Sequence, residues 1–111
     1  MPSITFDDFE KVEIRAGRII KAEPFPKARK PAYKLWLDFG EFGIKQSSAQ
    51  ITHGYTCAGL VGRIVLAAIN FPPKQVADFL SEVLVLGVIT GERDVVLIAP
   101  DREVAPGSRV L

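Results

Sequence analysis

The sequence predicts an all-β protein: a five-stranded Greek-key barrel of the OB type, with short helices and with extensions at both ends of the chain. Three observations favour this fold. Short apolar runs are separated throughout by glycine and proline, only two brief segments have helical spacing, and Gly17 interrupts the long first strand where a barrel strand would bend. A β-sandwich is the alternative, but the bend and the short helix before the fourth strand favour the barrel.

Two short helices are expected. The first lies within residues 4–12, because Thr5 is a suitable N-cap, acidic residues follow it, and Phe6 and Phe9 fall on one side of a helix. The second, a helix or a turn, is expected at residues 57–62. Neither segment is long enough to form the core of a helical domain.

The rest of the chain is expected to form strands. Residues 33–40 alternate so that Trp36 faces away from Leu35 and Leu37, and one of these sets should therefore leave the barrel interior. Near-continuous apolar runs at 63–71 and 81–89 are typical of strands buried on both faces. The other strands are expected at 13–23, 43–48, 94–100 and 108–111, with a turn at 47–50 and a proline-rich loop at 70–79.

The composition indicates a single folded domain over residues 1–111. The chain is 48% hydrophobic and 24% charged, which argues against disorder, and its length is close to the commonest domain size. No apolar run approaches the roughly 20 residues that span a bilayer, and the acidic N-terminus lacks the features of a secretory signal. A lone cysteine fits a reducing compartment. We therefore expect a cytoplasmic protein that does not insert into membranes.

The residues do not assemble an enzyme site. Ser47 and Ser48 lack the G-x-S-x-G turn of a serine nucleophile, and the only histidine, His53, is poorly placed to act as their base. Cys57 is interpreted as a packed thiol beside a surface histidine. One cysteine and one histidine cannot hold a structural zinc ion, and glycine-rich phosphate loops are absent. We predict no catalysis, no metal and no cofactor.

A basic loop is the first candidate binding feature. Residues 21–34 carry five cations against one acid, a local charge of +4, although the whole chain has a net charge of only +1. Phe25 and Tyr33 stand among the cations, as in proteins that neutralise phosphates and stack bases. The alternative is a solubilising loop stiffened by prolines. The candidate nucleic-acid residues are Lys27, Arg29, Lys30 and Lys34.

An apolar surface is the second candidate. Trp36, Phe71 and Phe79 are aromatic residues that the barrel interior cannot all accommodate, so they would form an oligomer interface or a groove for apolar chains. Polar neighbours would then bind the backbone of an extended peptide. The alternative for each polar residue is local hydrogen bonding in a turn. These polar candidates are Ser47, Ser48, Gln50 and Asn70.

Three stretches carry a family resemblance: KQSSAQI at 45–51, INFPP at 69–73 and SEVLVLG at 81–87. With residues 8–40 they resemble the CsaA-type proteins, small bacterial secretion chaperones built on the tRNA-binding OB domain that is also appended to methionyl-tRNA synthetases. The resemblance implies a homodimer whose extensions help form the interface. It also implies binding of unfolded precursor proteins and of the secretion ATPase, without nucleotide hydrolysis.

The resemblance also bears on tRNA binding. Related domains carry a Ser-x-Gly-Met turn where this chain has Ser81 and Glu82 followed by Val83 and Leu84. Ser81 is carried over as a contact to peptide or to tRNA, whereas Val83 would obstruct a nucleotide that approaches the backbone. We therefore predict a chaperone with protein-export activity, with tRNA binding through the basic loop as the alternative.

Overall fold

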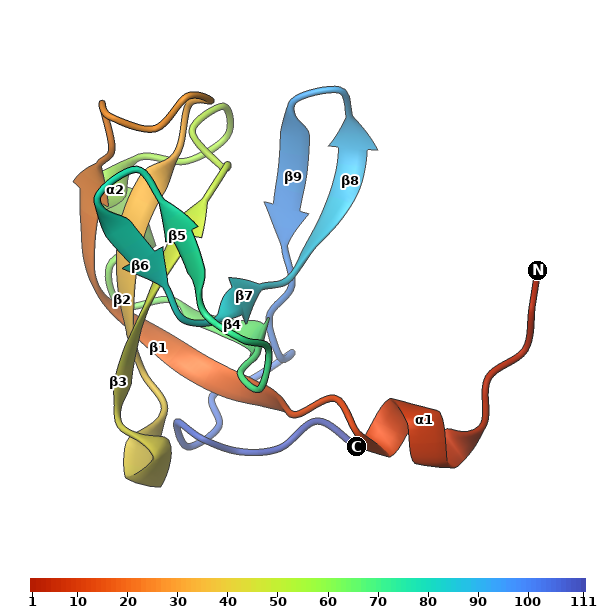
Figure 1. Ribbon diagram of the computed structural model, residues 1–111. Helices are drawn as coiled ribbons and strands as arrows, with labels where there is room; N and C mark the ends of the chain where they lie inside the picture. Colours follow the sequence, from red (N-terminus) through yellow and green to blue (C-terminus); the bar gives the residue numbers. More distant parts are fainter.

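The computed structural model describes all 111 residues and consists mainly of β-strands (Figure 1). Five strands form one antiparallel sheet in the order β3-β2-β1-β4-β7, which curls into a nearly closed barrel. The predicted all-β OB-type barrel is confirmed. Its strands are β1 (Ile14–Pro24), β2 (Tyr33–Asp38), β3 (Ile44–Ala49), β4 (Ile64–Ala68) and β7 (Leu84–Val85).

The long strand β1 belongs to both halves of the barrel. Its first residues pair with β4 and its last residues pair with β2, and the change of partner falls at Arg18, next to Gly17. The register of β1 is irregular between Ile19 and Lys21 and not at Gly17, where the bend was predicted. The glycine instead provides space, because a Cβ at this position would lie 2.5 Å from Cε1 of the Phe39 ring. The missing side chain therefore lets the buried ring pack directly against the backbone of β1.

The barrel interior is filled by one face of each strand. Leu35, Leu37 and Phe39 are fully buried, while Trp36 points to the other face and is only half-buried, as the alternation predicted. A core of ten residues results, which comprises Ile19, Leu35, Leu37, Phe39, Ala49, Ile51, Leu60, Val65, Ala67 and Val83. Leu60 reaches this core from α2 (Cys57–Leu60), the predicted second helix.

Two hairpins stand outside the barrel, and both differ from the prediction. Residues 70–79 were expected to be a loop, but they contain β5 (Lys74–Val76), which pairs with β6 (Phe79–Ser81). The single strand expected at 81–89 is divided among β6, β7 and β8 (Gly87–Gly91), because the chain leaves the barrel after β7 to form a ribbon with β9 (Asp94–Leu97). In Figure 1 this ribbon projects beside the barrel.

The strand β3 has the expected length but is displaced by one residue from the predicted 43–48. It spans Ile44–Ala49 with Ser47 and Ser48 inside the strand, so the turn predicted at 47–50 is wrong. A short 3-10 helix, η1 (Gly40–Phe42), connects β2 to β3.

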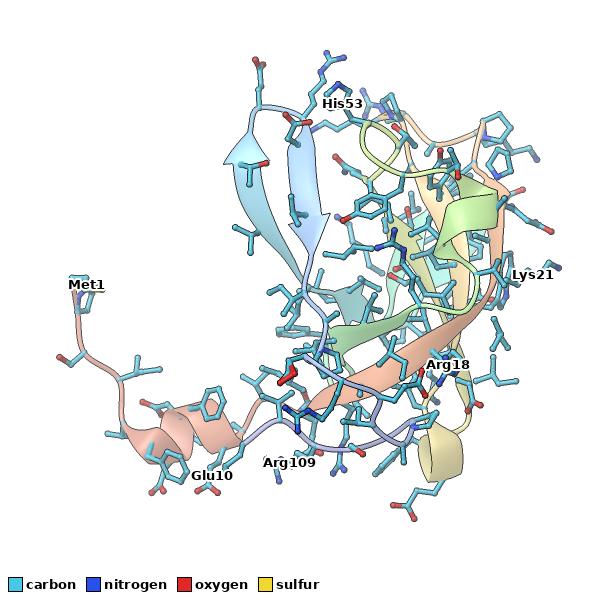
Figure 2. The ribbon with its side chains drawn as sticks, turned by 180° about the vertical axis from the view of Figure 1, so that it is seen from behind. Met1, Glu10, Arg18, Lys21, His53 and Arg109 are labelled. Carbon is cyan, nitrogen blue, oxygen red and sulfur yellow. The ribbon has the colours of Figure 1, made fainter.

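The two chain ends behave differently. Helix α1 (Phe6–Glu10) has the predicted Thr5 N-cap, completed by a capping box with Asp8, yet it buries no residue and projects from the body in Figure 1. The C-terminal segment instead packs along β1, where the backbone N–H of Gly107 donates to the carbonyl of Ala16 at 2.8 Å. The strand predicted at 108–111 is reduced to a single bridge. In the same region, Arg109 approaches Glu10 and donates to its carbonyl oxygen (Figure 2).

No helix is both long and apolar enough to cross a membrane.

Candidate functional site

The serine-rich stretch of β3 closes the barrel. The segment 80–83 runs beside β3, where the backbone N–H of Glu82 donates to the carbonyl of Gln46 at 2.8 Å. Most of the other hydrogen bonds across this seam use side chains. The Glu82 carboxylate accepts from the Gln46 N–H at 3.1 Å, and the Gln46 side-chain amide donates to the carbonyl of Leu80 at 2.8 Å. Side chains thus replace much of a regular strand ladder at the seam.

The two serines of β3 take different parts in this seam. Ser47 is buried, and its hydroxyl donates to the carbonyl of Val83 at 2.9 Å. Ser48 instead uses its backbone N–H, which donates to the hydroxyl oxygen of Ser81 at 3.0 Å. Ser47 therefore holds the fold together, whereas Ser48 and Ser81 lie at the edge of an open groove.

This groove has a volume of about 1370 Å³. It lies among the basic loop, the end of β3, the β5–β6 hairpin and β9. Twelve of its 21 lining residues are hydrophobic, and nearly all of these are aliphatic. A concave aliphatic floor with polar groups at its edge is suited to apolar side chains of a ligand. The aliphatic members are Ala28, Ala32, Ala49, Ile51, Val76, Ala77, Val83, Leu84, Val85, Val95 and Leu97.

The groove brings together some of the predicted site residues. Of the peptide-binding candidates, Ser48, Gln50, Phe71 and Ser81 line it, and Phe71 is half exposed there. Two of the nucleic-acid candidates also line it, Arg29 and Lys30.

Three other peptide-binding candidates lie elsewhere. Asn70 ties down the N-terminal extension, because its side chain accepts from the Glu13 N–H at 2.9 Å and donates to the Lys11 carbonyl at 2.7 Å. Phe79 was expected to line an exposed pocket, but it is 94% buried. Trp36 packs against it and does not reach the groove. The exposed aromatic pocket predicted from Trp36 and Phe79 is therefore wrong.

These aromatic rings form a separate cluster beneath the basic loop. The Phe79 ring meets Phe25 and Trp36 edge-on, with ring centroids 5.5 Å and 5.8 Å apart. The ammonium group of Lys34 lies over the Phe25 ring at 4.9 Å, and that of Lys21 lies over the Trp36 ring at 4.7 Å. Because Phe25 is buried by its neighbours, its ring is not open for a base to stack on.

Tyr33, the last aromatic residue of the basic loop, is also held by contacts within the chain. The Tyr33 hydroxyl donates to the carbonyl of Tyr55 at 2.7 Å, and its ring packs against the main core. The base-stacking role expected for Phe25 and Tyr33 is therefore not available in this structure.

An ion pair joins the basic loop to the β5–β6 hairpin. The Lys27 ammonium group lies 2.8 Å from a carboxylate oxygen of Asp78. This hydrogen bond, with the attraction between the two charges, raises the pKa of Lys27 and lowers the pKa of Asp78. Lys27 is consequently neutralised within the chain, unlike Arg29 and Lys30, which form no ion pair.

The catalytic alternatives find no support in the geometry. The imidazole Nδ1 of His53 contacts the carboxylate of Asp94 at the tip of the β8–β9 hairpin (Figure 2), while the Ser47 hydroxyl is bonded to a backbone carbonyl. His53 and Ser47 therefore contact different groups and do not form a pair of nucleophile and base.

Sequence reasoning missed two walls of the groove. Val95 and Leu97 of β9 form one wall, and Lys74 to Val76 of β5 form another. The strand predicted at 94–100 already places Val95 and Leu97 on one face, which is a signal for the first wall. The second depends on a hairpin whose turn at Ala77 has a φ of 51° without glycine, so the usual turn signal is missing.

Comparisons with known proteins agree with this architecture. The model of a family described as a putative tRNA binding domain matches residues 14–109. The chain is 34% identical, over 99% of its length, to a methionine–tRNA ligase of Methanosarcina acetivorans, but it spans only 15% of that protein.

Two solved structures match over their whole length. A crystal structure of chaperone CsaA from Bacillus anthracis is 47% identical, covers 99% of this chain and 100% of its own, and superposes with a TM-score of 0.95. A CsaA chaperone protein from Picrophilus torridus is 49% identical, covers 98% of this chain and 100% of its own, and gives a TM-score of 0.92. The chain therefore belongs to the tRNA-binding OB-domain family and, within that family, to the branch of the CsaA-type proteins.

Proposed function

We propose that this protein is a non-enzymatic chaperone that binds unfolded precursor polypeptides in the groove and supports protein export from the cytoplasm. The observation that carries the proposal is the groove itself, which is wide, open and lined mainly by aliphatic side chains. Burial of apolar surface in it contributes roughly 25 cal/mol per Å². Binding by mass action keeps an unfolded chain from aggregating and needs no energy input.

The similarity to CsaA chaperones supports this proposal, and so does the nature of the floor. Single-stranded nucleic acids are held by exposed aromatic rings together with cations. Here the only aromatic residue that lines the groove is Phe71, while Phe25 and Phe79 are buried against each other. An aliphatic floor favours a polypeptide over RNA bases. The secretion ATPase is the expected partner that receives the client.

A homodimer is part of the proposal. Helix α1 is five residues long and buries nothing, and a helix this short is not stable without packing. The β8–β9 ribbon likewise exposes Val88 and Val96, which pair across its two strands and share a face. A second copy of the chain would cover both surfaces. Val95 and Leu97 lie on the opposite face of β9, so dimerisation through Val96 leaves the groove accessible.

An aggregation assay tests the chaperone proposal. Light scattering of a chemically unfolded client protein, diluted into buffer, should be suppressed by the wild-type protein and not by Leu84→Asp, which places a charge on the groove floor. Val61→Asp is the matched control, because Val61 is 50% exposed and Leu84 is 51% exposed, and only Leu84 lines the groove. Equal suppression by all three proteins would contradict the proposal.

Binding of tRNA is the second candidate function. It is favoured by the matching family model and by Arg29 and Lys30, which carry charges that no acid in the chain neutralises. The double variant Arg29→Glu with Lys30→Glu should abolish tRNA binding and spare an uncharged apolar peptide. Filter binding with labelled tRNA and anisotropy with labelled peptide measure the two effects separately.

A further inference from the structure

The strand β5 has one edge without a neighbouring strand. It pairs only with β6, and β6 in turn lies beside β3. In Figure 1, β5 is on the side of β6 that faces β9. Backbone N–H and C=O groups of an antiparallel strand point alternately to its two sides, so one side of Lys74–Val76 presents such groups toward the groove.

The other wall of the groove suits the side chains of a strand placed along this edge. Val95 and Leu97 of β9 face the groove across from β5, and Val83, Leu84 and Val85 form the floor between them. An added strand would direct alternate side chains toward this apolar floor and the others toward solvent. The groove therefore offers backbone pairing on one wall and apolar contacts below and opposite.

Most of the charged residues that line the groove are basic. Arg29, Lys30 and Lys74 line it, and none of the three forms an ion pair within the chain. The single acidic residue in the lining, Glu82, has a carboxylate oxygen that already accepts the backbone N–H of Gln46. The groove consequently attracts a ligand with negative charges near its apolar part.

We propose that the groove binds an extended polypeptide as an additional strand along β5, and that it selects apolar segments flanked by aspartate or glutamate. This inference rests on the proposed chaperone function and specifies which segments of an unfolded client are bound. Backbone hydrogen bonds to β5 would supply affinity that is independent of sequence. The aliphatic floor and the three cations would supply the selectivity.

Fluorescence anisotropy with short labelled peptides tests both parts. One apolar core sequence is flanked by aspartate, by serine or by lysine, and the three peptides are titrated with the wild-type protein. The aspartate-flanked peptide should bind at least about fivefold more tightly than the lysine-flanked peptide. N-methylation at each core position in turn should weaken binding about three- to tenfold at alternate positions only.

Charge-reversal variants test which cations cause the preference for aspartate-flanked peptides. Lys74→Glu should remove most of the preference for aspartate flanks, whereas Arg102→Glu should retain it, because Arg102 is exposed and lies outside the groove. Binding of all three peptides with equal affinity, or N-methylation effects without alternation, would overturn this inference and leave the chaperone proposal intact. No binding of any peptide, together with no suppression of aggregation, would reject both. An oligonucleotide that displaces the aspartate-flanked peptide at lower concentration than the unlabelled peptide itself would also overturn the inference.

Discussion

The hydroxyl of Ser47 donates a 2.9 Å hydrogen bond to the carbonyl oxygen of Val83 across the seam that closes the barrel. Both residues are buried, at 1% and 5% exposure, so water does not replace this bond. A serine inside the core of a small barrel thereby satisfies a carbonyl that a regular strand ladder would have paired.

Removal of this hydroxyl should destabilise the fold. Ser47→Ala leaves the Val83 carbonyl without its partner, and the expected loss is about 1–3 kcal/mol in the free energy of unfolding. Ser48→Ala is the control, because Ser48 bonds across the seam through its backbone N–H, which alanine retains. Urea denaturation measures both variants, and equal losses would show that the hydroxyl bond does not hold the seam.

The close contact between Gly17 and the Phe39 ring leads to a second prediction. A Cβ at Gly17 would stand 2.5 Å from Cε1 of the Phe39 ring, which is fully buried. Gly17→Ala should therefore cost about 1–3 kcal/mol through overpacking. Gly54→Ala is the control, because a Cβ at Gly54 meets nothing within 4 Å. If thermal denaturation finds the two variants equally stable, the ring does not depend on the glycine.

The Lys27–Asp78 pair should make stability depend on pH at both extremes. The pKa of Asp78 is lowered below its ordinary 3.8, so its contribution to stability is present above pH 3.8 and is lost as the pH falls through the folded-state value. The pKa of Lys27 is raised above its ordinary 10.5, so its contribution is present below pH 10.5 and is lost as the pH rises through the folded-state value. The stability difference between the wild type and Asp78→Asn should therefore be present between these limits and shrink outside them. A difference that stays constant across the whole range would assign the effect to something other than the ion pair.

The exposed helix α1 provides a test of the proposed dimer. Phe6 is 61% exposed, and helix α1 buries no residue within one chain. Phe6→Asp should weaken self-association strongly while leaving the circular dichroism spectrum unchanged. Val61→Asp, on another surface, should change neither the self-association nor the spectrum. Analytical ultracentrifugation measures the association, and a wild-type protein that stays monomeric throughout would reject the dimer.

The sequence predicted those features that depend on local periodicity. The opposite placement of Trp36 and Leu35 follows from the two-residue repeat of a strand, and the Thr5 cap follows from local hydrogen bonding. The seam was not predictable in this way, because Ser47 and Val83 are 36 residues apart and meet only when the barrel closes. For the same reason, only part of the groove could be predicted from the sequence. Its polar edge includes Ser48, Gln50 and Ser81, but the burial of Phe79 depends on rings contributed by other segments.

The measurement that tests the central claim most directly is a pair of anisotropy titrations at two salt concentrations. A labelled unfolded polypeptide and a labelled tRNA are each titrated at about 50 mM and about 200 mM salt. The account predicts that the polypeptide binds at both concentrations with less than a tenfold change, because apolar burial is not screened. Tight tRNA binding that falls by roughly a hundredfold over this interval, with no binding of the polypeptide, would contradict it.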